Sequence, residues 1–120
     1  MPAALDHLKK RSEYLAVAGT NRRYTTPGLV LQARQTTSDE QKVGTNQVRV
    51  GFTATKKVGN AVIRNRARRR LRAAVAEVFD GLAARPADLV LVARQGTITR
   101  PYADLKTDLR LALRKLGIAQ

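Results

Sequence analysis

Residues 56–72, KKVGNAVIRNRARRRLR, concentrate side chains that could bind a polyanion. The segment contains two lysines and six arginines and no acidic residue. An arginine guanidinium can donate two parallel hydrogen bonds to one phosphate, which a lysine ammonium cannot do. A solvated helix normally interleaves Glu with Lys to gain i, i+4 ion pairs, and here no acid occurs before Glu77. The pattern therefore favours contact with a phosphate backbone over a merely solvated surface.

The chain offers no constellation of residues for catalysis by the protein itself. His7 is the only histidine, cysteine is absent, and the acidic residues are scattered without a pair spaced to hold two metal ions. We expect His7 to be exposed to solvent and no metal ion to be bound by the protein. The lack of cysteine excludes disulfides and thiolate metal sites and fits the reducing cytoplasm.

Composition predicts one RNA- or DNA-binding domain over residues 1–120. The 120 residues carry 23 Lys plus Arg against 9 Asp plus Glu, a net charge of +14 that costs self-repulsion unless a polyanion is bound. With 43% hydrophobic and 4% aromatic residues, the core must be mostly aliphatic. No signal-peptide pattern and no apolar run of about 18 residues occur, so we expect neither export nor a membrane partner.

The first half of the chain predicts one helix and two strands. Ser12 is a candidate N-cap and Gly19 a candidate end of a short helix. Residues 20–28 are typical of a turn-rich connection or a short edge strand. Apolar and polar residues alternate in residues 29–34 and 48–55, which predicts strands with one buried face. The polar segment between these two strands suits a long hairpin connection.

The second half predicts a strand between two helices. Residues 88–94, DLVLVAR, are apolar enough for the middle of a sheet. A final helix begins near Pro101 and ends at Gly117. The order of helix, strands, basic helix, strand and helix predicts an α+β fold, a single sheet with packed helices.

The basic helix is expected to begin at Asn60, whose side chain can cap the first turn. At 100° per residue, one broad apolar stripe faces the sheet: Ile63, Ala67, Leu71, Ala74, Val75, Val78, Phe79 and Leu82. The opposite side carries Asn65, Arg66, Arg69 and Arg72. Arg64, Arg68 and Arg70 border the stripe, with long stems that can follow apolar surface while the guanidinium groups reach outward. Nearly every charge in the first half of the helix can therefore face one partner.

These residues carry a resemblance to a known family. TKKVGNAVIRNRARRRLR closely resembles the signature of the bacterial ribonuclease P protein subunit, which runs from a Lys-Lys pair through Gly-Asn-Ala-Val to an Arg-Asn-Arg triplet and a basic helix. LKKRSEYLAV, RVGFTATKK and DLVLVAR resemble other parts of the family sequence, so the resemblance covers most of the chain. It implies the order α-β-β-β-α-β-α, with a left-handed crossover through the basic helix.

The resemblance also implies a function. The family removes the 5′ leader from precursor tRNA, with the catalytic RNA subunit hydrolysing a phosphodiester by means of bound Mg²⁺ and the protein subunit binding RNA. By position, the residues that match the part of the family docking on the catalytic RNA are Lys56, Lys57, Asn60, Arg64, Asn65, Arg66, Arg68, Arg69 and Arg72.

A second surface is implied for the single-stranded leader, between the first helix and the sheet. Its candidate residues are Lys9, Lys10, Arg11, Tyr14, Val17 and Gln32. Aromatic rings suit such a surface because any base can stack on them. Here Ala18 and Gln32 occupy positions that are commonly aromatic in the family, so we expect leader binding to rely more on charge, with Arg22 and Arg23 as further candidates.

Three alternatives compete with this hypothesis. A ribosomal or assembly protein would carry the same charge, but the contiguous Gly-Asn-Ala-Val-Ile-Arg-Asn-Arg run favours the processing subunit. A nuclease acting without RNA would need a catalytic constellation that the sequence lacks. A DNA-binding module is disfavoured because the chain has no zinc-finger pattern, no basic zipper and no convincing helix-turn-helix.

Overall fold

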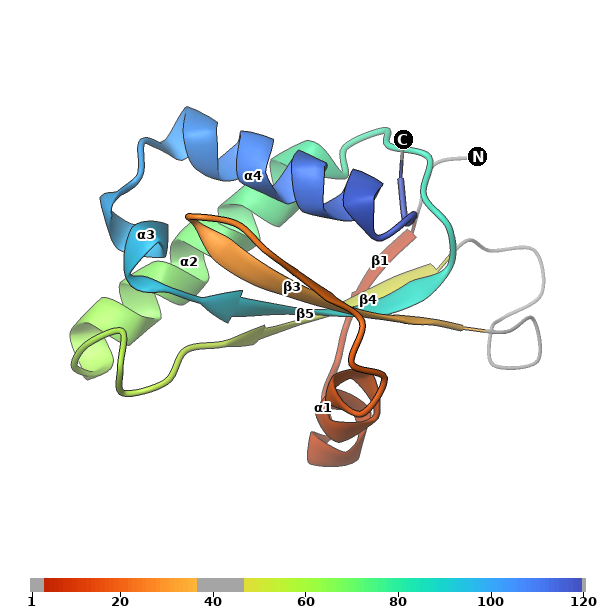
Figure 1. The fold of residues 1–120 in the computed structure, drawn as a ribbon, viewed down its shortest axis with the longest axis horizontal. Helices are drawn as coiled ribbons and strands as arrows, with labels where there is room; N and C mark the ends of the chain where they lie inside the picture. The colour runs from red at the N-terminus through yellow and green to blue at the C-terminus, as the bar shows by residue number, and fades with distance from the viewer. Residues whose placement is uncertain (1–3, 37–46, 120) are drawn as a thin grey trace.

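A five-stranded mixed sheet forms the middle layer of the computed structural model, which describes residues 4–36 and 47–119. The strand order is β1-β4-β5-β3-β2 (Figure 1). The strands are β1 Ala4–His7, β2 Arg23–Thr25, β3 Leu29–Gln35, β4 Gln47–Thr53 and β5 Ala87–Ala93. β5 lies at the centre, parallel to β4 and antiparallel to β3. The position predicted for this apolar strand is confirmed.

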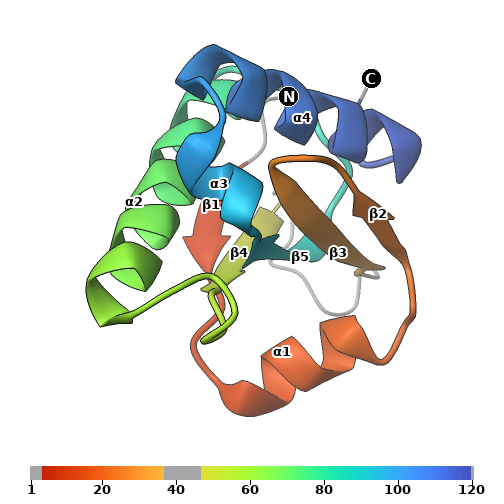
Figure 2. The same cartoon turned by 60° about the vertical axis from the view of Figure 1, so that its left-hand side comes forward.

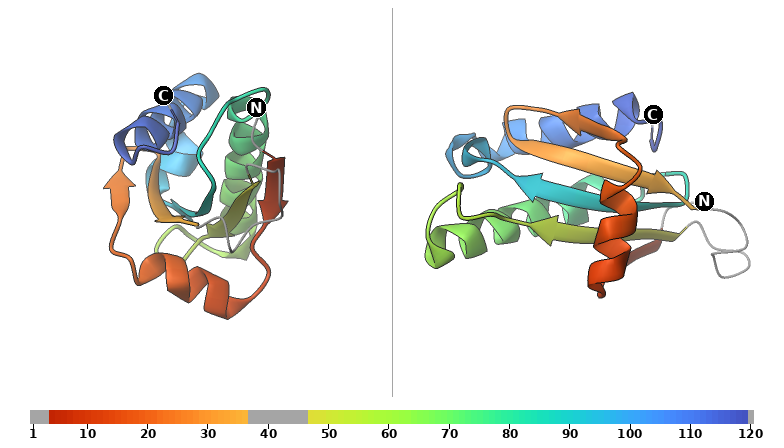
Figure 3. Two further views of the ribbon diagram at one scale, coloured as in Figure 1. Left: turned by 90° about the vertical axis from the view of Figure 1, so that its right-hand side faces the viewer. Right: turned by 60° about the horizontal axis from the view of Figure 1, so that its bottom comes forward.

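Helices cover both faces of the sheet (Figures 2 and 3). The short helix α1, Arg11–Ala18, lies on one face, and α2, Ala61–Val78, packs with α4, Tyr102–Lys115, on the other. A five-residue helix α3, Gln95–Thr99, connects β5 to α4 beside α2. No helix in the described ranges is long and apolar enough to cross a membrane.

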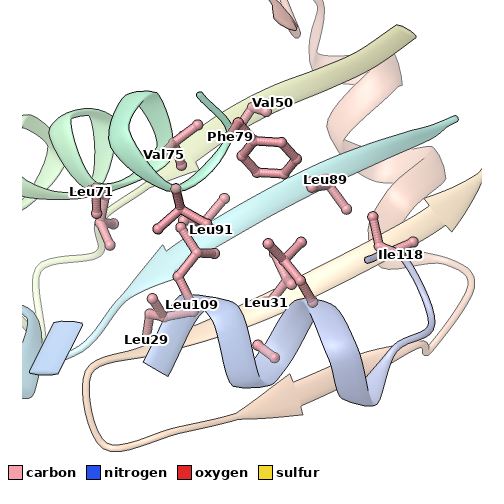
Figure 4. Packing of buried hydrophobic residues seen from close by; sticks show 14 of the residues in the cluster. Leu29, Leu31, Val50, Leu71, Val75, Phe79, Leu89, Leu91, Leu109 and Ile118 are labelled. Carbon is pink, nitrogen blue, oxygen red and sulfur yellow. The ribbon is translucent and has the colours of Figure 1, made fainter. Parts of the chain in front are cut away.

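The main core fills the space between the sheet and the pair α2 and α4. Leu29, Leu31 and Ala33 alternate along β3 toward this side and are fully buried. They meet Leu71 of α2 and Leu109 of α4 among a mostly aliphatic set of side chains (Figure 4). Burying such side chains contributes roughly 1.5–3 kcal/mol each, which holds α2 despite the like charges at its N-terminal end.

The connection from β4 through α2 to β5 is a left-handed crossover. The two strands are parallel neighbours, and α2 returns above the sheet between them, turning left-handed as the chain is followed (Figures 1 and 2). The family resemblance implied this handedness, although about 98% of such connections are right-handed. The crossover places the start of α2 at one end of the sheet.

The expected hairpin between the two long strands is wrong. β3 and β4 do not pair with each other, because β5 lies between them and pairs with both. β5 is almost entirely apolar and gains most from a position covered on both faces. Residues 37–46 of the polar connection lie outside the described residues.

Several element boundaries differ from the prediction. β1 and α3 were not predicted, although the short edge strand before Pro27 is confirmed as β2. Ser12 is not the N-cap: α1 begins one residue earlier, and the Glu13 carboxylate accepts the free backbone N–H groups of Lys9 and Lys10, each at 2.8 Å. Gly19 ends α1 as predicted.

The helices on the other face also show small differences. α4 begins at Tyr102, directly after Pro101, and Gly117 follows its end with a φ of 73°, a left-handed conformation that favours glycine. α2 ends at Val78, so Leu82 lies beyond the helix.

Candidate nucleic-acid interface

The start of α2 is fixed by a tight turn and a side-chain cap. The turn at residues 56–58 is closed by hydrogen bonds from Val58 N–H to the Thr55 carbonyl, 3.0 Å, and from Gly59 N–H to the Lys56 carbonyl, 3.2 Å. Gly59 has a φ of 150°, which disfavours any residue with a side chain. Asn60 is the predicted cap: its Oδ1 accepts from Ile63 N–H at 3.0 Å. The exposed lysines of the turn, Lys56 and Lys57, are therefore held beside the first turn of α2.

Three arginines form a row along one flank of α2. Arg64, Arg68 and Arg72 are spaced four residues apart and therefore lie above one another on the same side. The Arg64 Nε is buried and has no hydrogen-bond partner among the described residues. Arg72 lies 5.6 Å from the centre of the Phe52 ring of β4, a cation–π distance. The row therefore faces the β4 side of the helix, and Arg72 is not on the side opposite the sheet as the helical wheel predicted.

The outward side of α2 adds three more polar residues of the signature. Asn65, Arg66 and Arg69 are exposed, as predicted, and the Asn65 Oδ1 accepts from Arg68 Nη1 at 3.0 Å. Val62, next to them in the first turn, is 74% exposed.

Arg70 has a structural role. Its guanidinium group was predicted to reach outward and extend the charged surface, but it points to the backbone of α3 instead. Its guanidinium donates to the carbonyl oxygens of Thr97 at 2.8 Å, Ile98, and Arg100 at 2.7 Å. These carbonyls belong to the end of α3, where backbone acceptors lack helical partners. Arg70 thereby joins α2 to α3. Ile63 also differs, since it is 37% exposed and packs against Gly59 rather than in the core.

No ion pair within the described ranges neutralises the remaining signature cations. The carboxylates of Glu13, Glu77, Asp88 and Asp108 are paired with other basic residues. We call the surface formed by the nine signature residues the basic face: Lys56, Lys57, Asn60, Arg64, Asn65, Arg66, Arg68, Arg69 and Arg72. The structure brings all nine together on the β4–α2 turn, the N-cap of α2 and its first twelve residues.

A pocket of about 430 Å³ adjoins the basic face at Lys57. Its other walls are the end of β5 with Val92, the start of α3 and the turn at Pro27. Arg94 lines it and is held by a 2.7 Å hydrogen bond from Nη1 to the Thr26 carbonyl. Sequence reasoning missed Arg94, which stood only as the last residue of a predicted strand. The pocket extends positive charge from the turn toward the α1 side of the sheet.

On the α1 side, the basic residues before the helix are exposed as expected. Lys9, Lys10 and Arg11 surround the N-terminal end of α1, where Glu13 accepts two backbone N–H groups and the Arg49 guanidinium. These contacts keep the pKa of the Glu13 carboxyl below its ordinary value of 4.5, chiefly through the backbone hydrogen bonds of Lys10 and Lys9.

Tyr14 and Val17 attach α1 to the sheet. A Cβ atom on Gly51 of β4 would lie 2.5 Å from carbon atoms of the Tyr14 ring, so the ring lies directly on the glycine backbone. Tyr14 remains partly exposed, whereas Val17 is fully buried with Leu8 and Val90. Val17 therefore packs the helix onto the sheet and has no surface left for a ligand.

Gln32 lies on the sheet face that α1 partly covers. It pairs with Val90 of β5 and Arg23 of β2, and it is only partly buried. The next row of the same face consists of Arg34, Asp88 and Arg49, one from each of β3, β5 and β4. Arg49 donates to both oxygens of Asp88 and also to Glu13. Sequence reasoning missed this row, although the strand alternation had placed Arg49 on the polar face.

Ala18, Arg22 and Arg23 complete the candidate leader surface. Ala18 is exposed, and its methyl side chain supplies no ring for base stacking. Arg23 is exposed beside Gln32. Arg22 differs from expectation, because its Nη2 donates to the Leu116 carbonyl at 2.6 Å, at the end of α4 on the opposite face. His7 is exposed, and no group of three or more metal-binding side chains occurs within residues 4–36 and 47–119.

Comparison with known proteins identifies the family. The sequence model of the family described as Ribonuclease P matches residues 3–117. A ribonuclease P protein component of Paramagnetospirillum magneticum is 48% identical over 120 residues, which cover 100% of this chain and 89% of that protein. One from Gluconacetobacter diazotrophicus is 50% identical over 111 residues, covering 92% and 90% of the two chains.

Solved structures show the same fold at lower identity. The RNase P protein of Staphylococcus aureus superposes with a TM-score of 0.75 at 19% identity, covering 95% of this chain and 97% of that one. The RNase P protein of Thermotoga maritima gives 0.72 at 20% identity, covering 91% and 96%. Their similarity supports the strand order and the crossover. From the match of the family sequence model and its two bacterial relatives, the chain belongs to the family of ribonuclease P protein components.

Proposed function

We propose that this protein is the RNA-binding subunit of ribonuclease P and docks on the catalytic RNA through the basic face. The observation that carries the proposal is the set of signature cations that have no carboxylate partner among the described residues and that lie on one turn and two adjacent sides of α2. Neutralising phosphates with these groups releases condensed counterions, which drives association. The buried and unpartnered Arg64 Nε is an additional donor that a phosphate or base oxygen would satisfy.

The protein's own contribution is binding and orientation. Arginine forks fix the position of the protein on the catalytic RNA by donating to its phosphates, while the exposed Val62 can pack on a ribose or base. Mg²⁺ bound by the catalytic RNA supplies the chemistry that hydrolyses the phosphodiester at the 5′ leader of precursor tRNA. We assign no residue of the chain to that step. We place the protein in the cytoplasm.

The proposal extends to the precursor tRNA leader on the α1 side of the sheet. Tyr14 offers part of a ring for stacking, and the amide of Gln32 can donate to or accept from a base edge. Lys9, Lys10 and Arg11 lie at one end of this surface and can contact phosphates. With Ala18 in place of a second ring, leader affinity should depend more on charge than on stacking.

Reconstitution tests this function directly. Purified protein added to a bacterial catalytic RNA and a precursor tRNA should increase leader cleavage at low Mg²⁺, and protein alone should cleave nothing. No gain with any concentration of protein would contradict the processing role and favour an RNA-assembly protein. Cleavage by the protein in the absence of RNA would instead reveal a nuclease.

Two arginine variants locate the interface on the protein. Arg64→Ala and Arg66→Ala should each weaken affinity for the catalytic RNA by about 1–3 kcal/mol, because a charge-assisted contact is lost. Arg110→Ala is a matched control, since Arg110 is exposed on α4 and outside the basic face. The affinity of the native chain should fall steeply with salt. Equal affinities for all variants, or a flat salt titration, would remove the basic face from the interface.

A further inference from the structure

A second basic pocket lies beyond the far end of α2 from the basic face. Its volume is about 870 Å³, within the range of pockets that hold small organic molecules. Three arginines line it, Arg22, Arg85 and Arg114, together with aliphatic side chains that include Leu82, Leu116 and Ile118. Among the residues that the structure describes, no acidic side chain lines the pocket. It therefore combines a positive rim with an apolar floor.

The walls of this pocket are fixed by contacts between distant parts of the chain. The Arg22 Nη2 donates to the Leu116 carbonyl at 2.6 Å, which ties the segment before β2 to the end of α4. Arg85 N–H donates to the Ile118 carbonyl at 2.8 Å, and Ala84 forms a β-bridge with Ala119. Because these contacts lie within the chain itself, they hold the walls of the pocket in place, and binding would cost little ordering entropy.

The charges of the pocket are available to a ligand. Within the described ranges, the guanidinium groups of Arg85 and Arg114 make no hydrogen bond and no ion pair, and both residues are exposed. Arg22 uses one nitrogen on the Leu116 carbonyl, which leaves other donors of its planar fork free. Three cations around one hollow repel one another unless an anion lies between them.

The pocket is separate from the basic face. The basic face lies at the N-terminal end of α2, and the pocket is lined by residues that follow its C-terminal end. With 18 residues, α2 is about 27 Å long at 1.5 Å per residue. Figure 1 shows the helix running along the length of the molecule between these two ends. A ligand in the pocket therefore cannot share phosphate groups with the first turn of α2.

We propose that this pocket binds an unpaired nucleotide of single-stranded RNA. Guanidinium groups take the phosphate by paired hydrogen bonds and can stack on a base, and the aliphatic floor accepts the face of the base. An acidic peptide would satisfy the rim but would leave the apolar floor exposed to water. The pocket thus gives the protein a third RNA contact, beyond the docking and leader surfaces of the proposed function.

The test uses the full-length chain and a defined RNA. The pentanucleotide of adenosine is titrated into ¹⁵N-labelled protein that carries Arg64→Ala and Arg66→Ala, so that binding at the basic face is reduced. The expected result is a set of saturable shifts at the amides of residues 82–85 and 116–119. Arg85→Ala combined with Arg114→Ala should weaken this binding about tenfold or more, because contacts to a charged group are lost.

The matched control is Lys115→Ala. It removes one positive charge from the last turn of α4, as Arg114→Ala does. Lys115 is exposed and does not line the pocket. This variant should bind within about twofold of its parent, and the unfolding curves of all variants should remain cooperative. If a pocket variant unfolds, Arg85→Lys and Arg114→Lys, which keep the charge but lose the fork, take its place, and weaker binding is again expected.

Three outcomes would overturn the proposal. The first is that the amides around the pocket do not shift. The second is that Lys115→Ala weakens binding as much as the pocket variant does. The third is that a pentamer of glutamate binds there as tightly as the RNA. Each outcome is read without catalytic RNA or precursor tRNA. Failure here would therefore leave the reconstitution result, and with it the proposed function, untouched.

Discussion

Arg49 and Asp88 face each other across the parallel strands β4 and β5, and the Arg49 guanidinium donates to both oxygens of the carboxylate, at 2.8 Å and 2.7 Å. Asp88 is 2% exposed, so its charge is held by Arg49 and by Arg34 at 3.3 Å. The hydrogen bonds that Arg49 donates to Asp88 raise the pKa of the Arg49 guanidinium above its ordinary range. The same guanidinium also contacts Glu13, so one side chain joins two strands to α1.

Arg49→Ala should lower the free energy of unfolding by about 2–3 kcal/mol, because it leaves a buried carboxylate with one weaker partner. Urea denaturation at neutral pH measures the change. Arg69→Ala, a fully solvated arginine of α2, is the control and should change stability by no more than about 0.5 kcal/mol. Equal stabilities for both variants would show that the pair contributes nothing net.

Gly51→Ala should destabilise the packing of α1, since the new Cβ would lie 2.5 Å from the Tyr14 ring. The expected loss is about 1–3 kcal/mol in urea denaturation, as for other overpacked sites. In a Tyr14→Ala background the same change should cost much less, because the ring is no longer there. Identical costs in the two backgrounds would contradict the close contact.

Adjacent arginines of α2 should separate stability from RNA binding. Arg70→Ala removes three hydrogen bonds to carbonyls at the end of α3 and should lower unfolding free energy by about 1–3 kcal/mol. Arg69→Ala should leave stability unchanged and weaken binding to the catalytic RNA, since Arg69 is exposed on the basic face. Urea curves and filter binding of both variants give the comparison, and the reverse pattern would exchange the two roles.

Acid should loosen α1 through Glu13. Its folded pKa lies below the ordinary 4.5, held down by backbone N–H groups and Arg49, so its contribution to stability is complete above the unfolded pKa. That contribution is lost as the pH falls through the lower folded value. Unfolding free energies measured between about pH 6 and 3 should show a smaller acid loss for Glu13→Gln than for the native chain. Parallel pH curves would rule out this role for Glu13.

Local patterns in the sequence were enough to predict several parts of the structure. The cap at Asn60 and the alternation in β3 and β4 depend on neighbours along the chain, and both are confirmed. The mostly apolar residues of β5 predicted a strand in the middle of the sheet, which is also confirmed. A run of arginines without acids favoured cations that find no carboxylate partner within the chain. In the described part of the structure none of these arginines forms an ion pair, although Arg70 donates to backbone carbonyls.

Other features depend on contacts between residues distant in sequence. Helical periodicity gave only the angle at which Arg70 and Arg72 leave the helix axis. The contacts of these residues depend on neighbouring elements: Arg70 donates to carbonyls at the end of α3, and Arg72 lies over Phe52 of β4. The hairpin prediction failed for a similar reason, because sequence proximity of β3 and β4 mattered less than burial of β5 between them. The pocket of Arg22, Arg85 and Arg114 gathers three separate segments, which no local pattern connects.

The sequence by itself determined which residues carry charge, which alternate and which cap, because these properties act over a few neighbouring residues. The tertiary structure decided which arginines face a partner and which satisfy backbone carbonyls, because hydrogen-bond acceptors and apolar surface were brought near them only by folding.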